Sequence, residues 1–185
     1  MKLKMLTRWY FALVVLVVAF ACSPTEKPNQ NGDTIQLFNG KNLDGWYKYL
    51  KSTGRDNDPK NVFTVANGEL FITGEDYGCI TTNEEYENYR LVVEYKWGEK
   101  TYEPRVDKAR DNGVLIHSMG EDGAFSGSWM YSIECQIIEG GTGDFLVVGD
   151  GSETYQLTAM VADPDKKGAK LYQSGGRPAT IYGGR

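Results

Sequence analysis

The stretch Trp129–Phe145, which reads WMYSIECQIIEGGTGDF, constrains the fold more than any other part of this chain. Its polar and apolar residues alternate with a period of two, the period at which side chains of a β-strand point to opposite faces. The pattern therefore predicts a strand over Met130–Ile138. The side chains predicted to point to a core are Tyr131, Ile133, Cys135 and Ile137, and those predicted to point away are Ser132, Glu134 and Gln136.

A carboxylate and an amide, Glu134 and Gln136, then share one surface. Sugar hydroxyls need fixed donors and acceptors, and the C–H faces of a sugar pack against aromatic rings such as that of Trp129. On a curved antiparallel sheet this pair, followed by a glycine-rich loop, has the features of a sugar-binding cleft. The alternative is that both are solvated residues on an outer face, and spacing alone does not decide between the two interpretations.

From Asp33 onward the whole chain has the pattern of an all-β domain, with short alternating or β-branched runs separated by turn residues. Asn67-Gly68 predicts a two-residue hairpin turn. Tyr89–Trp97 alternates over most of its length, which is typical of a long strand in a sandwich. The expected strands are Ile35–Leu37, Phe63–Ala66, Glu69–Thr73, Cys79–Thr81, Tyr89–Trp97, Gly113–Ser118, Met130–Ile138, Phe145–Val148 and Thr154–Ala162. Helical periodicity is not convincing anywhere, and Glu99–Asp111, which contains Pro104, is predicted to be a loop.

The first residues have the pattern of a secretory signal. Lys2, Lys4 and Arg8 precede the apolar run Phe11–Ala21, which is too short to span a membrane. Small residues before Cys22 resemble the lipobox at which bacterial lipoproteins are cleaved and acylated. We therefore expect a signal peptide over residues 1–21, a lipidated Cys22, a flexible tether over residues 22–33 and a domain over residues 34–185, held at the bacterial cell envelope by its lipid. An ordinary cleaved signal peptide is the alternative.

Charge and cysteine content limit the function classes. The chain has 20 basic and 25 acidic residues, and loss of residues 1–21 with their three basic residues would leave a net charge of −8. This argues against nucleic acid or anionic lipid headgroups as ligands. Cys79 and Cys135 could pair in an oxidising compartment or remain buried thiols, and the sequence leaves both open.

Three segments together resemble the bacterial 3-keto-disaccharide hydrolase family: FNGKNLDGWY at Phe38–Tyr47, DNGVLIHS at Asp111–Ser118 and Trp129–Phe145. The resemblance covers most of residues 35–160. It implies a concanavalin-like jelly roll of two antiparallel sheets, and an enzyme whose glycoside substrates carry a ketone at C3. In the first segment we expect Trp46 to pack in the core and Asn39-Gly40 to turn the chain.

A C3 ketone acidifies the hydrogen on C2, so the glycosidic bond can break by elimination, and later addition of water makes the net reaction hydrolysis. This chemistry needs a base near C2, an electrophile or metal near the C3 oxygen and a proton donor for the leaving group. The predicted base and acid are Glu134, which matches an acid in the family's motif, and His117, the only histidine in the chain. The residues predicted to bind the substrate are Gln136, Asp111, Asn112, Trp129 and Asp144.

Glu139 and Asp144 bracket Gly140-Gly141-Thr142-Gly143, an oxygen-rich loop that could hold a divalent cation such as calcium, magnesium or manganese. The same residues also describe an ordinary tight turn. No zinc-binding spacing is present.

Two other functions compete with the keto-glycoside enzyme. One is a carbohydrate-binding module of concanavalin-like fold, since fold alone does not decide function. The other is a retaining glycosidase, which needs two carboxylates about 5–5.5 Å apart. Gln136 stands where the second acid of a Glu-x-Glu pair would be and cannot ionise, although Glu139 or an acid from another strand could replace it.

The last residues, from Asp163-Pro164-Asp165 to Tyr182-Gly183-Gly184-Arg185, have a turn-like composition. The resemblance implies further strands beyond this point, so the expected sandwich is incomplete at its C-terminus. Such a domain would expose strand edges and apolar faces.

Overall fold

A computed structural model describes residues 34–183. The predicted signal peptide, the lipidated Cys22 and the tether lie outside the described residues and stay predictions. Residues Gln36–Arg185 cluster as one compact unit, and the description below concerns this unit. Over the part of the chain that is described, no helix is long and apolar enough to cross a membrane.

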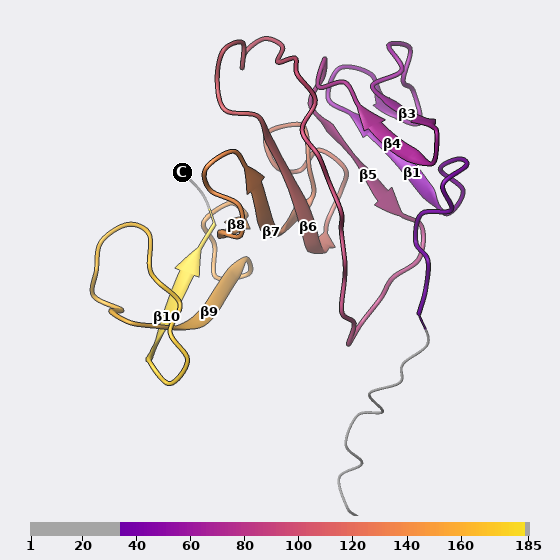
Figure 1. The fold of residues 1–185 in the computed structure, drawn as a ribbon. Coiled ribbons are helices and arrows are strands. Elements are labelled where there is room, and N and C mark those ends of the chain that lie inside the picture. The colour runs from indigo at the N-terminus through magenta and orange to yellow at the C-terminus, as the bar shows by residue number, and fades with distance from the viewer. Residues whose placement is uncertain (1–33, 184–185) are drawn as a thin grey trace, which may run out of the picture. The chain divides into compact units, whose positions relative to one another are not determined.

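Residues 34–183 contain ten strands and no helix (Figure 1). The strands are β1 (Trp46–Leu50), β2 (Gly54–Arg55), β3 (Phe63–Ala66), β4 (Glu69–Ile72), β5 (Gly78–Thr82), β6 (Asp111–Met119), β7 (Tyr131–Ile138), β8 (Phe145–Val148), β9 (Gln156–Val161) and β10 (Arg177–Tyr182). They form four antiparallel sheets in the orders β2-β1-β5, β3-β4, β6-β7-β8 and β9-β10. The predicted all-β class is confirmed, and the antiparallel sheets are consistent with a sandwich.

The hairpin of β3 and β4 forms where the sequence predicts it. Asn67 and Gly68 have φ angles of 54° and 81°, and the strands on either side pair from Ala66 and Glu69 outward. Two successive positive φ angles give a turn whose twist matches the twist of the strands, which is why Asn-Gly is so strong a hairpin signal.

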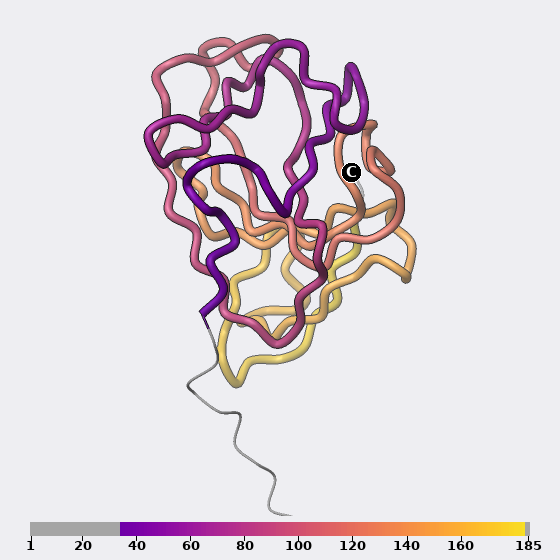
Figure 2. The backbone as a smooth tube through the Cα atoms, turned by 90° about the vertical axis from the view of Figure 1, so that its right-hand side faces the viewer, coloured from indigo at the N-terminus to yellow at the C-terminus, as the bar shows by residue number. Residues whose placement is uncertain are grey.

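The predicted strand Tyr89–Trp97 is wrong. Residues 83–110 form an extended connection between β5 and β6 that joins no sheet (Figures 1 and 2). Leu91, Val93 and Tyr95, predicted to line one face, are 38, 49 and 49% exposed. Alternation makes a segment able to form a strand, but the strand also needs a partner for its backbone groups, and no described strand pairs with this one.

The N-terminal part of the unit also differs from the prediction. No strand forms at Ile35–Leu37, and the first strand is β1, which was not predicted. Trp46 is only half-buried rather than in the core, and its Nε1 donates a hydrogen bond to the Leu37 carbonyl at 2.7 Å. Asn39 turns the chain as expected, because its Oδ1 accepts from the backbone N–H of Lys41 at 2.7 Å.

β10 was likewise missed, because Arg177–Tyr182 lies in a segment of turn-like composition. It pairs with β9 over its whole length, from Arg177 opposite Val161 to Tyr182 opposite Gln156. Thr158 and Thr180 face each other across this ladder with their hydroxyl oxygens 2.9 Å apart.

A small core forms under β1 and β3 and depends on one buried carboxylate. Leu50, Val62 and Phe63 are its buried members. The Asp58 side chain, 1% exposed, accepts hydrogen bonds from the backbone N–H groups of Val62 and Phe63 at 2.7 and 3.0 Å, and from Lys48 Nζ at 3.1 Å. Burial alone would raise the pKa of Asp58, but these donors lower it below its usual value.

Asp58→Ala should lower the free energy of unfolding by about 1–3 kcal/mol, because two buried backbone N–H groups lose their acceptor. Chemical denaturation of the purified domain measures this. The matched control is Glu75→Ala at an exposed acid, for which we expect a change within about 0.5 kcal/mol. Equal effects of the two substitutions would contradict the structural role of Asp58.

Candidate active site

The candidate site lies on the sheet β6-β7-β8, whose central strand carries Glu134. In the antiparallel register, Glu134 is opposite Leu115 on β6 and Leu146 on β8, and Gln136 is opposite Gly113. Residues opposite each other share a face of the sheet. Glu134 and Gln136 therefore lie on one face, and Ile133, Cys135 and Ile137 lie on the other, as the alternation predicts.

Each face of β7 carries one buried residue. Ser132, on the Glu134 face, is 6% exposed, and Ile137, on the other face, is 8% exposed. Glu134 and Gln136 are half-buried. The two side chains are therefore partly shielded from solvent, which favours the cleft interpretation over a freely solvated outer face.

Gly113 makes the space that the Glu134 side chain occupies. A Cβ atom at this position would come within 2.8 Å of Glu134 Cγ and Cδ and would collide with Oε1. Gly113 does not have a positive φ angle, so this glycine is required by the close approach of a side chain rather than by a turn. The sequence contains Gly113 in the DNGVLIHS segment, but only the register across to β7 reveals what it does.

Two effects raise the pKa of Glu134 above its ordinary value. The larger is burial, which penalises the charged form, and the smaller is the negative charge of Asp111. A carboxylate whose pKa is raised is a stronger base than an exposed one, and perturbed carboxylates of this kind are typical of catalytic sites.

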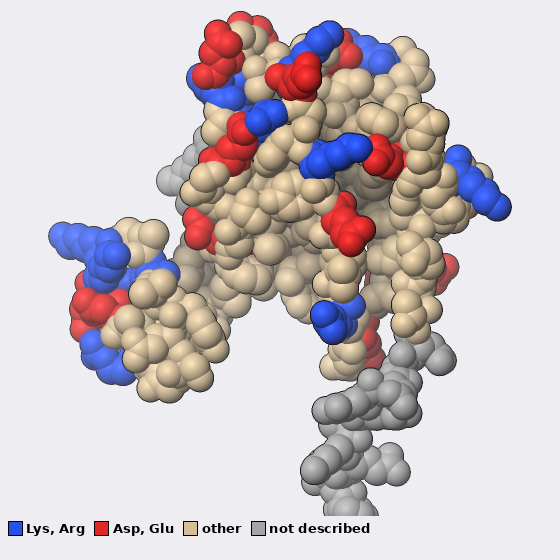
Figure 3. Space-filling model, viewed as in Figure 1, with Lys and Arg blue, Asp and Glu red and all other residues tan. Residues whose placement is uncertain are grey.

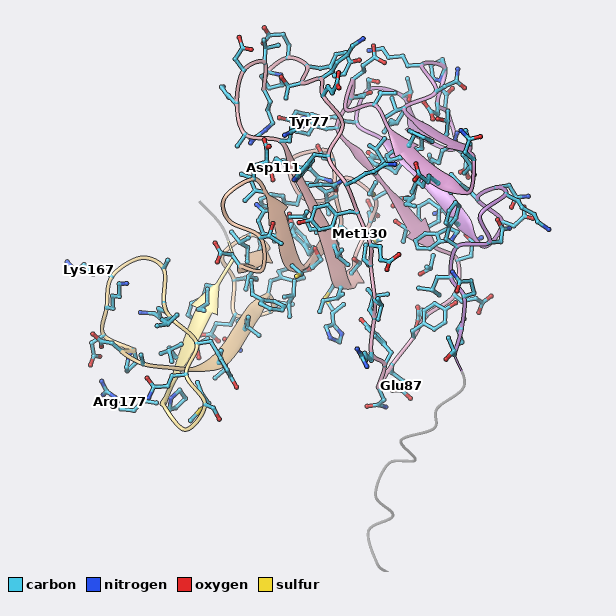
Figure 4. All side chains as sticks on the ribbon, viewed as in Figure 1. Tyr77, Glu87, Asp111, Met130, Lys167 and Arg177 are labelled. Atoms are coloured by element: carbon cyan, nitrogen blue, oxygen red, sulfur yellow. The ribbon has the colours of Figure 1, made fainter. Side chains whose placement is uncertain are left out.

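Asp111 is the first residue of β6, two residues before Gly113, and Figure 4 labels it at the start of that strand. Its carboxylate pairs with Arg105, whose terminal guanidinium nitrogen lies 3.1 Å from Asp111 Oδ2. The other terminal nitrogen of Arg105 donates to the Ala109 carbonyl at 2.8 Å. The guanidinium group is thus held from two sides beside β6. Sequence reasoning missed Arg105, because it lies in a charged loop with no motif around it.

Two buried side-chain atoms in residues 34–183 have no hydrogen-bond partner: Arg105 Nε and Gln136 Oε1. Nearly all buried polar atoms of native proteins are paired, so each exception needs an explanation. Arg105 Nε is a donor and Gln136 Oε1 is an acceptor. A ligand with carbonyl and hydroxyl oxygens could satisfy both.

His117 has different surroundings from those predicted. A β-bulge interrupts the register between Ile116 and Met119, and His117 has a φ angle of 53°. It is exposed and lines a pocket with Ile133 and Val147, from the face opposite Glu134, and with Ser132, from the Glu134 face. Among the described residues no hydrogen bond joins His117 to Glu134, and the pairing of the two as acid and base stays a prediction.

Trp129, predicted to bind substrate, takes part in an aromatic cluster within the fold. Its ring is edge-on to Tyr77 at 5.9 Å between centroids and stacks on Phe125 at 6.4 Å. Its Nε1 donates to the Gly78 carbonyl at 3.3 Å. These contacts use both the ring and the N–H, which is a structural rather than a ligand-binding arrangement.

One of the two acids that bracket the predicted cation loop, Glu139, forms an ion pair with Arg110 instead. The Glu139 carboxylate accepts hydrogen bonds from the side chain and the backbone N–H of Arg110, which lower the pKa of Glu139 to about 2. Asp144 is exposed, and its backbone carbonyl accepts from Gln136 N–H. No group of three His, Cys, Asp or Glu side chains within residues 34–183 is placed to hold a metal ion.

The remaining candidates are on or near the same sheet. Asn112 follows Asp111 on β6 but alternates to the other face, and its Oδ1 lies 2.8 Å from the Gly113 backbone nitrogen. Cys79 and Cys135 are both free thiols. Burial raises the pKa of the Cys79 thiol, which makes it a poor nucleophile.

The arrangement can therefore do one kind of chemistry well. Glu134 supplies a base, Gln136 a buried acceptor and Arg105 a fixed cationic donor. The alternation of β7 puts Glu134 and Gln136 on one face of the sheet. Arg105 is linked to this face through its ion pair with Asp111. Over the molecular face in Figure 3, Lys and Arg side chains alternate with Asp and Glu rather than gathering by sign. Such a site can remove a proton from a neutral, polar molecule next to a carbonyl group.

Comparison with known proteins gives one match. A family model described as a 3-keto-alpha-glucoside-1,2-lyase-like domain matches residues 33–178. The matched region contains every described residue of the candidate site, and the family is the one that the sequence motifs indicate. No curated protein and no solved structure matches the chain.

The Glu139–Arg110 pair should make stability depend on pH in an acid window. The pKa of Glu139 is about 2 in the fold against an ordinary value of 4.5. Its contribution is therefore complete above pH 4.5 and is lost as the pH falls through about 2. We expect the unfolding free energy of the wild type to fall more steeply across this window than that of Glu139→Gln, measured by denaturant titration at several pH values. Parallel pH profiles would contradict the pairing.

Proposed function

Because the chain belongs to the 3-keto-alpha-glucoside-1,2-lyase-like family, we propose that it is an enzyme that cleaves the glycosidic bond of 3-keto glycosides by elimination. The observation that carries this proposal is the half-buried Glu134, whose pKa is raised and whose carboxylate lies in the space left by Gly113. The family match supports a sugar substrate, and the geometry around Glu134 supports proton abstraction as the first step.

In this mechanism the Glu134 carboxylate removes the hydrogen on C2 as a proton. The electron pair of the C2–H bond forms a C2=C3 double bond, and the C3=O π pair moves onto the C3 oxygen to give an enolate. The enolate then re-forms the ketone, the C2=C3 pair moves to C1=C2, and the bond between C1 and the glycosidic oxygen breaks. A proton from Glu134, carried directly or through water, neutralises the departing oxygen.

Addition of water across C1=C2 completes the net hydrolysis. The hydroxyl group joins C1 and a proton returns to C2, so the product is the free 3-keto sugar. The attacking water can give its proton to the Glu134 carboxylate, which then passes it to C2. No oxidation or reduction takes place, because the ketone enters with the substrate and leaves with the product.

Comparing an oxidised with an unoxidised substrate distinguishes this mechanism from ordinary glycoside hydrolysis. We expect the purified protein to release the aglycone from a 3-keto glucoside and to leave the matching unoxidised glucoside intact. Both reactions can be followed by aglycone absorbance. Equal release from the two substrates would exclude elimination, and no release from either would leave the protein without the proposed activity.

A retaining glycosidase is the second candidate, and Asp111 gives it a specific observation. Asp111 is an acid on the strand next to Glu134, close enough for its charge to act on the Glu134 pKa. However, its carboxylate is already engaged by Arg105 at 3.1 Å. A carboxylate held in an ion pair is a weak nucleophile, so the geometry favours elimination. Cleavage of the unoxidised glucoside would favour the second candidate.

Glu134→Gln should abolish most turnover while making the fold slightly more stable at neutral pH. Turnover should fall by about 10²–10⁴-fold, the typical contribution of a general base. The pKa of Glu134 is raised in the fold, so the stability linked to its protonated form is present at acid pH and is lost as the pH rises through that pKa. Glutamine stays neutral at every pH, so the variant does not lose this stability as the pH rises. Kinetics and thermal unfolding at two pH values measure both effects.

The matched control is His117→Asn, since asparagine tolerates the positive φ angle at this position. Its turnover should stay within about threefold of the wild type, because His117 lies in the β-bulge and forms no hydrogen bond with Glu134 among the described residues. A loss as large as that of Glu134→Gln would restore His117 as the acid. If Glu134→Gln instead retained turnover and unfolded at lower temperature, Glu134 would be structural.

A further inference from the structure

The loop before β6 holds one guanidinium group in a fixed orientation with one donor unused. Arg105 reaches Asp111 Oδ2 through one terminal nitrogen at 3.1 Å and the Ala109 carbonyl through the other at 2.8 Å. Its Nε is buried and has no partner among the described residues. Two contacts thus fix the plane of the group, and the third donor is left for something else.

The second arginine of the same loop shows what a purely structural arrangement looks like. Arg110 binds the Glu139 carboxylate and the Gly98 carbonyl, and its guanidinium lies 5.8 Å from the centre of the Trp97 ring. Neither the Arg110 guanidinium nor the Glu139 carboxylate has a buried atom without a partner. The two arginines are five residues apart, so their difference comes from their surroundings rather than from the loop as a whole.

The unused donor, Arg105 Nε, belongs to a side chain that is paired with a residue on the Glu134 face of the sheet. Arg105 is held by Asp111, which is two residues from Gly113 on β6 and so shares its face. Gly113 borders the Glu134 carboxylate, and the charge of Asp111 acts on Glu134. Gln136, with its unpaired Oε1, is the residue opposite Gly113. The base and the acceptor thus adjoin one glycine, and the donor is linked to the same face through its ion pair with Asp111.

We propose that Arg105 is a catalytic residue that donates its Nε–H to the C3 oxygen of the substrate and stabilises the enolate formed there. This inference rests on the proposed function and names the electrophile that the elimination needs. As the C2 proton passes to Glu134, negative charge develops on the C3 oxygen, and the guanidinium meets it with a fixed, cationic donor. A preorganised donor of this kind needs no reorientation during the reaction.

Gln136 completes the recognition of the ketone. The hydroxyl group on a carbon next to C3 can donate to Gln136 Oε1 while the C3 oxygen accepts from Arg105 Nε. A sugar with a hydroxyl at C3 would bind less well, since it places a weaker acceptor before the cationic donor. The pair therefore selects a hydroxyketone over the unoxidised sugar.

Four variants test the role of Arg105: Arg105→Gln, Arg105→Lys, Arg105→Ala and the control Arg110→Gln. Arg105→Gln should lower kcat for a 3-keto glucoside by about 10²–10³-fold with a much smaller change in KM, the usual result of losing one oxyanion donor. Arg105→Lys keeps the charge but not the planar fork, so it should restore only part of kcat. Added ethylguanidinium should partly rescue a third substitution, Arg105→Ala. Arg110→Gln should lower thermal stability and leave kcat close to that of the wild type.

A binding measurement separates this inference from the proposed function. The ligand is a 3-keto sugar with hydrogen in place of the leaving group at C1, compared by calorimetry with its C3-hydroxyl counterpart. The wild type should prefer the ketone, and Arg105→Gln should lose that preference.

The outcomes are distinct. If the wild type cleaves no 3-keto glycoside but shows a ketone preference that depends on Arg105, the proposed function fails and the ketone site stands. If the preference survives in Arg105→Gln or is absent from the wild type, or if Arg105→Gln keeps kcat within about threefold of the wild type, the role of Arg105 is overturned.

Discussion

The antiparallel pairing of β6 with β7 is the interaction on which the candidate site depends. It sets Gly113 opposite Gln136 and Leu115 opposite Glu134, so the glycine and the carboxylate meet on one face. A slip of one residue would turn Glu134 to the other face and bring a larger side chain into the space that it now occupies. The register therefore places a half-buried carboxylate at this position, and burial is the larger of the two causes that raise its pKa.

Local signals in the sequence predict a good part of this arrangement. The alternation over Met130–Ile138 predicts β7 and the face of Glu134, the Asn67-Gly68 pair predicts the β3-β4 hairpin, and Phe145–Val148 matches β8 at both ends. Each of these depends on neighbours a few residues apart, whose periodicity and turn geometry are written in the local sequence. The family resemblance, confirmed over residues 33–178, depends on the same local segments.

The remaining features depend on partners far apart in the chain, which local patterns do not specify. Tyr89–Trp97 alternates well but finds no partner strand among the described residues, whereas β10 lacks a clear pattern and forms because β9 is beside it. The bulge at His117 breaks an alternation that the sequence shows as continuous. Arg105 becomes visible only once its ion pair with Asp111 is known.

Asp58, which is buried, and Glu134, which is half-buried, show how one chain treats two acids differently. Asp58 is surrounded by two backbone N–H groups and Lys48, so its pKa falls and its charge stabilises the fold. Glu134 is partly buried without a cationic partner and has Asp111 as its charged neighbour, so its pKa rises, mainly through burial, and its charge weakens the fold. A protein that needed only a stable sheet would gain by replacing Glu134 with an apolar residue. The uncompensated carboxylate, with the unpaired Arg105 Nε and Gln136 Oε1 at the same sheet, is therefore better explained by a ligand than by folding.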